Sequence, residues 1–151
     1  MIRDDIKAAL VVAMKARDTT TTAAIRLIQS TIKNRDIELR TAAALPDDDL
    51  LITEVLQKMI KQRRESIEMY EKGNRPELAA AEAAEVEVIE RFLPRQMSDD
   101  EARAAIDALA TELDASSVKD MGRVMAALKE RFAGQMDMGK ASGLVKARLA
   151  G

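Results

Sequence analysis

Histidine and cysteine are both absent from this sequence of 151 residues. Without them the chain cannot form a disulfide, a thiolate nucleophile, an imidazole general base or a zinc site of the Cys/His type. We therefore expect no catalytic residues, no metal site and no cofactor in this chain.

Aromatic side chains are also scarce, because the chain has no Trp, one Tyr and two Phe. Hydrophobic residues still make up 47% of the sequence, so the core must consist of Ala, Leu, Ile, Val and Met. The strong helix formers Ala, Leu, Met, Glu, Lys, Arg and Gln dominate the composition. This composition predicts an all-α protein.

Long apolar runs are missing as well, since no stretch approaches the roughly 18 uninterrupted apolar residues of a membrane span. The first residues, MIRDDIK, contain acids, unlike a signal or transit peptide. We expect a soluble, cytoplasmic protein without a membrane partner. Its net charge of -2 gives no general attraction to nucleic acid, so we expect no DNA partner, and RNA binding would need a local basic patch.

Apolar periodicity and helix-capping residues predict seven helices. They cover residues 2–17, 22–40, 49–72, 75–92, 99–113, 118–132 and 138–150. Leu93-Pro94 and the capping box that begins at Ser98 interrupt this pattern most clearly. The sequence thus predicts a helical domain of about four helices, residues 1–94, followed by a small three-helix bundle, residues 95–151.

Local rules add further expectations within this pattern. The threonines at positions 19–22 should separate the first two helices, and the acids after Pro46 should cap the third. Gly73 should adopt a left-handed conformation, and Asn74 should cap the fourth helix. The apolar residues expected to face the core include Val11 and Met14 in the first helix and Leu78 in the fourth.

Arg63 lies among the apolar residues of the third predicted helix, between Met59 and Ile67. A partly buried guanidinium needs a carboxylate or several carbonyl groups as partners. We therefore expect a structural ion pair between Arg63 and an acid of the fourth helix, where the candidates are Glu82, Glu85, Glu87 and Glu90.

The segment KMIKQRR of the third helix contains the basic residues Lys58, Lys61, Arg63 and Arg64 and no acid. It is one candidate for phosphate binding. Each of Glu54, Glu65 and Glu68, however, lies four residues from one of these cations. Such spacing is typical of an ordinary solvated helix face, which is the interpretation we favour.

Charge is distributed unevenly in the predicted three-helix bundle. Residues 98–114 hold six acids and one base, whereas residues 115–151 hold seven basic residues and three acids. The phrase Asp-Met-Gly-basic occurs twice in the second segment, ending at Arg123 and at Lys140. Its glycines lack the spacing and the preceding strand of a P-loop, so they indicate helix punctuation. Lys119, Arg123 and Arg131 lie opposite the apolar face of their helix, and we expect them to be free for a partner.

Five stretches of the chain resemble the GatB/YqeY family: ALVVAMKARD, IRLIQSTIKNRDIE, LQKMIKQRRESIEMYEKGNRPELAAAEAAE, FLPRQMSDDE and DMGRVMAALKERFAG. They occur in the order of the family, cover nearly the whole chain, and are similar to the free-standing YqeY type. The resemblance implies a helical first part and a three-helix unit. In GatB, the B subunit of the tRNA-dependent amidotransferase, the corresponding C-terminal part is implicated in holding tRNA, and the catalytic domains lie elsewhere.

The resemblance implies a protein that binds tRNA, or a tRNA-charging or amidotransferase complex, without a catalytic centre of its own. The residues expected to contact RNA phosphates are Lys119, Arg123, Arg131, Lys140 and Lys146, with Lys58, Lys61 and Arg64 as a second surface. The scarcity of aromatic residues argues against stacking on single-stranded bases. Two alternatives are a protein-protein interaction module and a carbon-nitrogen ligase activity, with glutamine as amido donor, that exists only within a larger complex.

Overall fold

The computed structural model describes residues 1–150. Every regular element in that range is helical, which confirms the predicted all-α class. Contacts between residues group the chain into two compact units, Met1–Leu93 and Pro94–Gly151.

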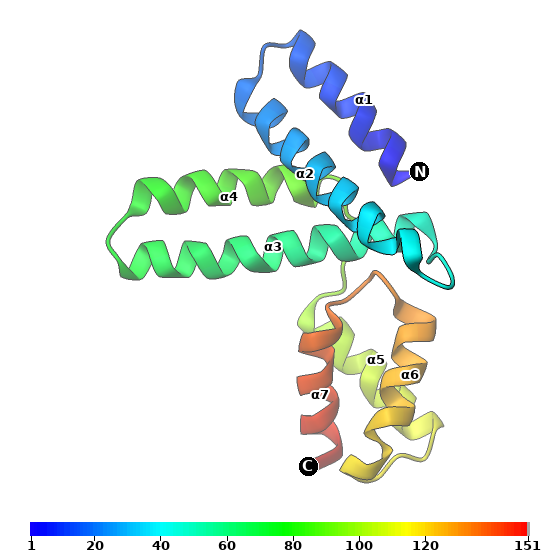
Figure 1. Cartoon of the computed structure of the whole chain (residues 1–151). Helices are drawn as coiled ribbons and strands as arrows, with labels where there is room; N and C mark the ends of the chain where they lie inside the picture. The colour runs from blue at the N-terminus through cyan, green and yellow to red at the C-terminus, as the bar shows by residue number, and fades with distance from the viewer. Residues whose placement is uncertain (151) are drawn as a thin grey trace. The chain divides into compact units, whose positions relative to one another are not determined.

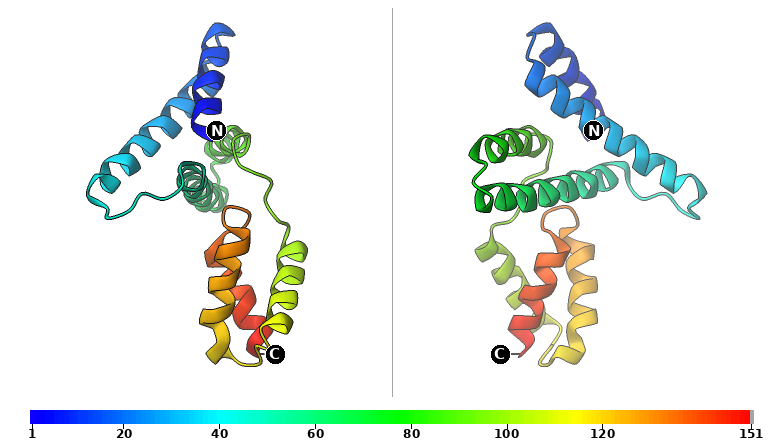
Figure 2. Two further views of the ribbon diagram at one scale, coloured as in Figure 1. Left: turned by 90° about the vertical axis from the view of Figure 1, so that its right-hand side faces the viewer. Right: turned by 60° about the vertical axis from the view of Figure 1, so that its left-hand side comes forward.

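Four α-helices form the N-terminal unit. They are α1 (Ile2–Lys15), α2 (Thr19–Glu38), α3 (Asp48–Lys72) and α4 (Pro76–Glu90), with a short 3-10 helix, η1 (Leu39–Thr41), after α2. The helices pair as two antiparallel hairpins, α1–α2 and α3–α4 (Figure 1). Helix α2 packs on both α3 and α4, so the hairpins cross and enclose one core (Figure 2). The largest fully buried side chains of this core are aliphatic: Ile6, Ile25, Ile28, Ile52, Leu56 and Ile89.

Arg3 joins three helices of this unit. Its guanidinium donates two hydrogen bonds to Asp36 of α2, at 3.0 and 3.1 Å, and two to Asp48 of α3, at 2.8 and 3.2 Å. The pKa of Asp48 lies below its usual range, mainly because its carboxyl accepts hydrogen bonds from Arg3. Arg3 therefore ties the first helix to the two helices beside which it packs.

The three consecutive aspartates at the start of α3 have different partners. Asp47 accepts an N–H of the first turn of α3 at 3.1 Å and caps that helix, as predicted. Asp48 pairs with Arg3, and Asp49 accepts the N–H of Ile2 at 3.0 Å, which caps α1 from another helix. Local sequence rules predict only the first of these roles, because the other two depend on contacts 45 and 47 residues away.

Three helices and a 3-10 turn form the C-terminal unit. They are α5 (Asp99–Glu112), η2 (Val118–Asp120), α6 (Met121–Phe132) and α7 (Met138–Ala150), and the three α-helices pack as the predicted bundle (Figure 1). Fully buried Ile106, Leu109, Val124, Leu128 and Val145 fill its core. The capping box at Ser98 is confirmed: its hydroxyl accepts the N–H of Glu101 at 3.1 Å, and the Glu101 carboxylate accepts the N–H of Ser98 at 3.3 Å.

Helices α1, α3 and α5 all end in the same motif. The residue after each C-cap has a left-handed backbone: Arg17 with φ 57°, Asn74 with φ 56° and Asp114 with φ 53°. The next amide then donates to the carbonyl five residues earlier, at 3.0, 2.8 and 2.8 Å respectively. This is the Schellman arrangement, in which glycine usually occupies the left-handed position. All three turns use another residue there.

The prediction of a left-handed Gly73 is therefore wrong, because Gly73 has φ -84° and Asn74 takes the left-handed position. Asn tolerates that conformation better than most residues. A residue in that conformation does not adopt the extended backbone of an N-cap. The predicted cap at Asn74 is also wrong, since Arg75 precedes α4 and makes no side-chain cap.

The start of α2 differs from the prediction as well. The helix begins at Thr19 rather than at Thr22, because the carboxylate of Asp18 accepts the N–H of Thr21 at 3.1 Å and caps it. The threonines thus occupy the first turn of the helix, where the N–H groups have no intrahelical partner in any case.

Three apolar residues predicted to face the core are instead exposed: Val11 (49%), Met14 (50%) and Leu78 (42%). Each step of four residues rotates by about 40° around a helix. Met14 is three such steps from the buried Ile2 and has turned away, so that Ala13 is buried in its place. Leu78 lies in the first turn of α4, where Ala79 takes the buried position.

Replacing Arg3 by Met should destabilise the N-terminal unit by about 1–2 kcal/mol, because charged hydrogen bonds are removed while both carboxylates stay partly exposed. The difference in free energy of unfolding between wild type and variant should be largest above about pH 4. It should shrink as the pH falls through the lowered pKa of Asp48, because protonated Asp48 no longer pairs with Arg3. Urea unfolding followed by the fluorescence of Tyr70, the only Tyr of the chain, monitors this unit. Arg35→Met, which removes an exposed pair with Glu38, is the control and should cost less than about 0.5 kcal/mol. Equal destabilisation of the two variants would contradict the role of Arg3.

Replacing Arg17 by Gly should stabilise the same unit by about 0.5–1 kcal/mol, because glycine adopts φ 57° without the steric cost of a Cβ atom. The Tyr70 signal in urea measures this change too. Ala16→Gly is the matched control in the same turn, where the backbone is right-handed, and it should lower stability. Destabilisation by Arg17→Gly would show that its side chain, and not its backbone, determines the turn.

Candidate nucleic-acid interface

Acidic side chains of α5 neutralise cations of α6 and α7. Three ion pairs link these helices: Arg131 with Glu112 at 2.7 Å, Lys140 with Asp99 at 2.7 Å, and Arg148 with Asp107 at 2.6 Å. The pKa values of Glu112 and Asp99 lie below their usual ranges, because Arg131 and Lys140 donate hydrogen bonds to these carboxyls. Acids of the acidic segment, residues 98–114, thus form ion pairs with cations of the basic segment, residues 115–151.

Arg123 has a structural contact at each end of its guanidinium. One nitrogen donates to the carbonyl of Leu113, the C-cap of α5, at 3.2 Å, and another donates to Asp120 at 2.9 Å. Asp120 also accepts the backbone N–H groups of Ser116 and Ser117, at 3.1 and 3.4 Å. The serine pair and Arg123 therefore belong to the turn between α5 and α6.

The expectation that the basic residues of the sixth helix are free for a partner is consequently wrong for Arg123 and Arg131. Both guanidinium groups donate to carboxylates of the same unit. Local sequence spacing could not indicate the partner of Arg131, because Glu112 lies 19 residues away on a different helix.

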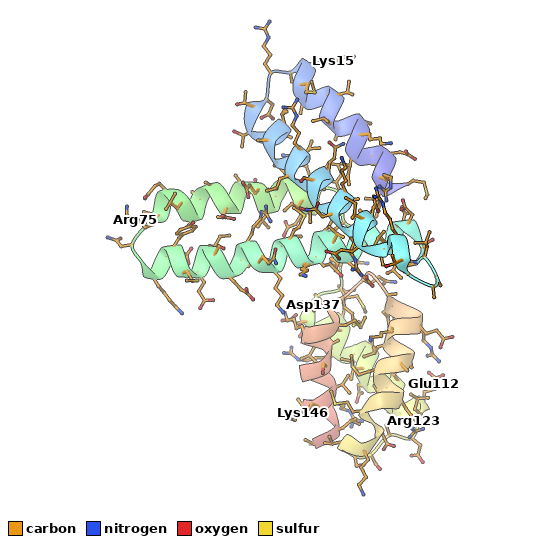
Figure 3. The ribbon with its side chains drawn as sticks, in the orientation of Figure 1. Lys15, Arg75, Glu112, Arg123, Asp137 and Lys146 are labelled. Carbon is orange, nitrogen blue, oxygen red and sulfur yellow. The ribbon has the colours of Figure 1, made fainter. Side chains whose placement is uncertain are left out.

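The two copies of the Asp-Met-Gly-basic phrase lie at opposite ends of the C-terminal unit. Helices α6 and α7 run antiparallel, so the start of one lies beside the end of the other (Figure 1). Figure 3 shows Arg123 at one end of the unit and Asp137, which begins the second copy, at the other. Asp137 accepts the N–H of Gly139 at 2.8 Å and acts as a helix cap. The repeated phrase therefore does not form one phosphate site.

Lys119 and Lys146 differ from the other cations predicted in this unit. Both side chains are exposed, and neither forms an ion pair with any residue in the range 1–150. Lys119 lies in η2, and Lys146 lies near the end of α7, the helix that η2 contacts. These two lysines are the predicted cations of this unit whose charge is not offset by a bonded carboxylate.

The cations in the basic segment of α3 also include both paired and unpaired side chains. Arg64 pairs with Glu90 of α4 at 2.9 Å, whereas Lys58 and Lys61 are exposed and make no ion pair with the described residues. Glu68, which lies four residues from Arg64 in the sequence, pairs instead with Lys72 of the same helix. Lys58 lines a groove of about 440 Å³ between α2 and α3.

Arg63 lies inside the α3–α4 hairpin. Its side chain is 12% exposed, and its Nε donates to Glu85 at 2.8 Å, with Glu82 at 4.0 Å. A terminal nitrogen also donates to the carbonyl of Met59 at 3.2 Å. These contacts give Arg63 a structural role and leave it without an accessible face for a ligand.

A further groove, of about 230 Å³, lies between α1 and α2. Its walls carry Arg3, Lys7, Gln29, Lys33 and Asp36, above a floor of Ile6 and Ile32. We call it the α1–α2 groove. Local sequence patterns do not distinguish Lys7 and Lys33 from other surface lysines, because only the register between the two helices brings them to one groove. The pairing of Arg3 with Asp36 sets that register.

The described residues show neither a membrane span nor a carboxylate cluster for a metal. No helix within residues 1–150 is long and apolar enough to cross a membrane. In the same range, no group of three or more acidic side chains is placed to hold a metal ion.

Comparison with known proteins identifies the family of the chain. The family model described as Yqey-like protein matches residues 3–149. A relative from Lachancea thermotolerans, named Altered inheritance of mitochondria protein 41, mitochondrial, is 34% identical over 118 residues, which are 77% of this chain and 59% of the relative. Proteins of the same name from Eremothecium gossypii and Saccharomyces cerevisiae are 34% and 29% identical over 67% and 79% of this chain.

This chain spans about three-fifths of the length of those relatives, since the matches cover 59%, 55% and 64% of them. The family model nevertheless covers almost every residue of both structural units. The resemblance carried by the five sequence stretches is confirmed, and the chain belongs to the YqeY-like protein family.

Proposed function

We propose that this protein binds tRNA, or a tRNA-charging or amidotransferase complex that carries tRNA, and that it has no catalytic centre of its own. Lys119 and Lys146 are the leading phosphate contacts, and Lys58 and Lys61 form the second surface. The proposal rests on the resemblance to the tRNA-holding part of GatB and on one observation. That observation is that Lys119 and Lys146 are exposed, unpaired and on contacting elements, η2 and α7.

The paired cations Arg64, Arg123, Arg131 and Lys140 have a secondary role in this proposal. Water screens these exposed ion pairs, so each is weak and a phosphate can displace the carboxylate from its cation. The exchange is less favourable than contact with an unpaired lysine, because one ion pair is broken for each one formed. Such contacts position RNA without selecting its sequence.

The other functions raised by the sequence remain predictions with less support. Exposed Val11, Val12 and Met14 on α1 are compatible with a protein-protein interaction module. Retention of a protein partner after nuclease treatment would distinguish such a module from an RNA-binding protein. A cytoplasmic location is likewise a prediction, and localisation of the tagged full-length chain would test it.

Replacing Lys119 and Lys146 together by Gln should weaken binding of labelled tRNA. It should also reduce the slope of log affinity against log salt by about 0.7–0.9 for each RNA phosphate that these lysines neutralise. Titrations at several salt concentrations measure both quantities. Arg95→Gln/Arg103→Gln is the matched control, because it removes two cations of the same unit that are paired with Glu101 and Asp100. Absence of tRNA binding at low salt, or equal effects in both double variants, would overturn the proposal.

Replacing Glu112 by Gln should strengthen tRNA binding by about two- to fivefold, because Arg131 is released from its bidentate carboxylate and becomes available to phosphate. The same titration provides the measurement. Glu130→Gln removes an equal charge next to Arg131 and breaks no ion pair of the described residues, so it controls for net charge. Equal strengthening in the two variants would mean that Arg131 does not contact the RNA.

A further inference from the structure

The two lysines of the α1–α2 groove have no acidic partner. Lys7 on α1 and Lys33 on α2 are exposed, and neither forms an ion pair with the described residues. The acid that lines the groove is Asp36, and both of its oxygens accept hydrogen bonds from Arg3. The groove therefore presents two uncommitted ammonium groups beside an acid that is already paired.

Other features of the groove suit an anion that carries several oxygens. Gln29 adds an amide donor to the same groove, and the floor of Ile6 and Ile32 excludes water from one side. Arg26, one turn before Gln29 on α2, reaches across to the sulfur of Met14 on α1 at 4.0 Å. A line of cations thus follows the contact between these two helices.

We infer that the α1–α2 groove binds a phosphate group of the RNA backbone, held between the ammonium groups of Lys7 and Lys33 with Gln29 as a third donor. This site lies outside both surfaces named under the proposed function and, as an RNA contact, rests on that function. Arg3 shares its charge between Asp36 and Asp48, so it orients the groove and does not bind the ligand.

The charges indicate a modest affinity for a single phosphate. Arg3 with its two aspartates carries one net negative charge, and Lys7 and Lys33 carry two positive charges, which leaves a small positive balance. Water screens both exposed lysines. The groove therefore acts as one contact along a longer polyanion, where several weak phosphate contacts combine.

The test uses the full-length variant Lys7→Gln/Lys33→Gln and the matched control Lys72→Gln/Arg75→Gln, which removes two exposed cations at the α3–α4 turn of the same unit. We expect the groove variant to weaken tRNA binding about fivefold at low salt, and the control to change it by less than about twofold. Equal weakening in both variants, or no weakening in the groove variant, would overturn the inference. Urea unfolding followed by Tyr70 fluorescence verifies that each variant is folded.

A second probe separates this inference from the proposed function. Inorganic pyrophosphate titrated into labelled full-length protein should shift the backbone amide signals of Lys7, Gln29 and Lys33 saturably in the nuclear magnetic resonance spectrum. The shifts should vanish in the groove variant and persist in the control. If the protein binds no tRNA but shows these shifts, the proposed function fails and a groove for free phosphate compounds is supported. If the shifts are also absent, the groove is not a phosphate site.

Discussion

Four hydrogen bonds from the guanidinium of Arg3 determine how the first three helices fit together. They connect α1 to Asp36 near the end of α2 and to Asp48 at the start of α3. The neighbouring Asp49 caps α1 at the same junction. Because this junction sets the register of α1 against α2, it also brings Lys7 and Lys33 to one groove, and it pairs the acid of that groove, Asp36, with Arg3.

The distribution of acids determines which cations are available for a partner. In both units an acidic helix face lies against a basic one: α5 beside α6 and α7, and α4 beside α3. Arginines take part in most of these pairs, and lysines form most of the unpaired positive surface. This division follows from geometry, because a planar guanidinium matches a carboxylate with two hydrogen bonds, whereas an ammonium group is a more strongly hydrated point charge.

The sequence predicted the helical class, the seven helices and the capping box at Ser98, because these depend on local periodicity and local hydrogen bonds. It failed at Gly73, where the choice between two adjacent turn residues depends on how the hairpin closes. It failed for the free state of Arg131 and did not indicate the pairing of Arg64 with Glu90, because the partner of each arginine lies on another helix. The sequence did not indicate Lys7 and Lys33 for the same reason. Each alone is an ordinary surface lysine, and only the packing of α1 on α2 brings both of them to one groove.

The carboxylates of α5 are counter-ions that cannot diffuse away. Binding of RNA to a free lysine releases condensed small ions into solution, and the entropy of that release drives much of the affinity. A phosphate that replaces Glu112 at Arg131, or Asp99 at Lys140, releases instead a carboxylate that stays tethered to the protein. The C-terminal unit therefore has a smaller effective ionic valence than its count of basic residues, and its association with any polyanion is correspondingly less sensitive to salt.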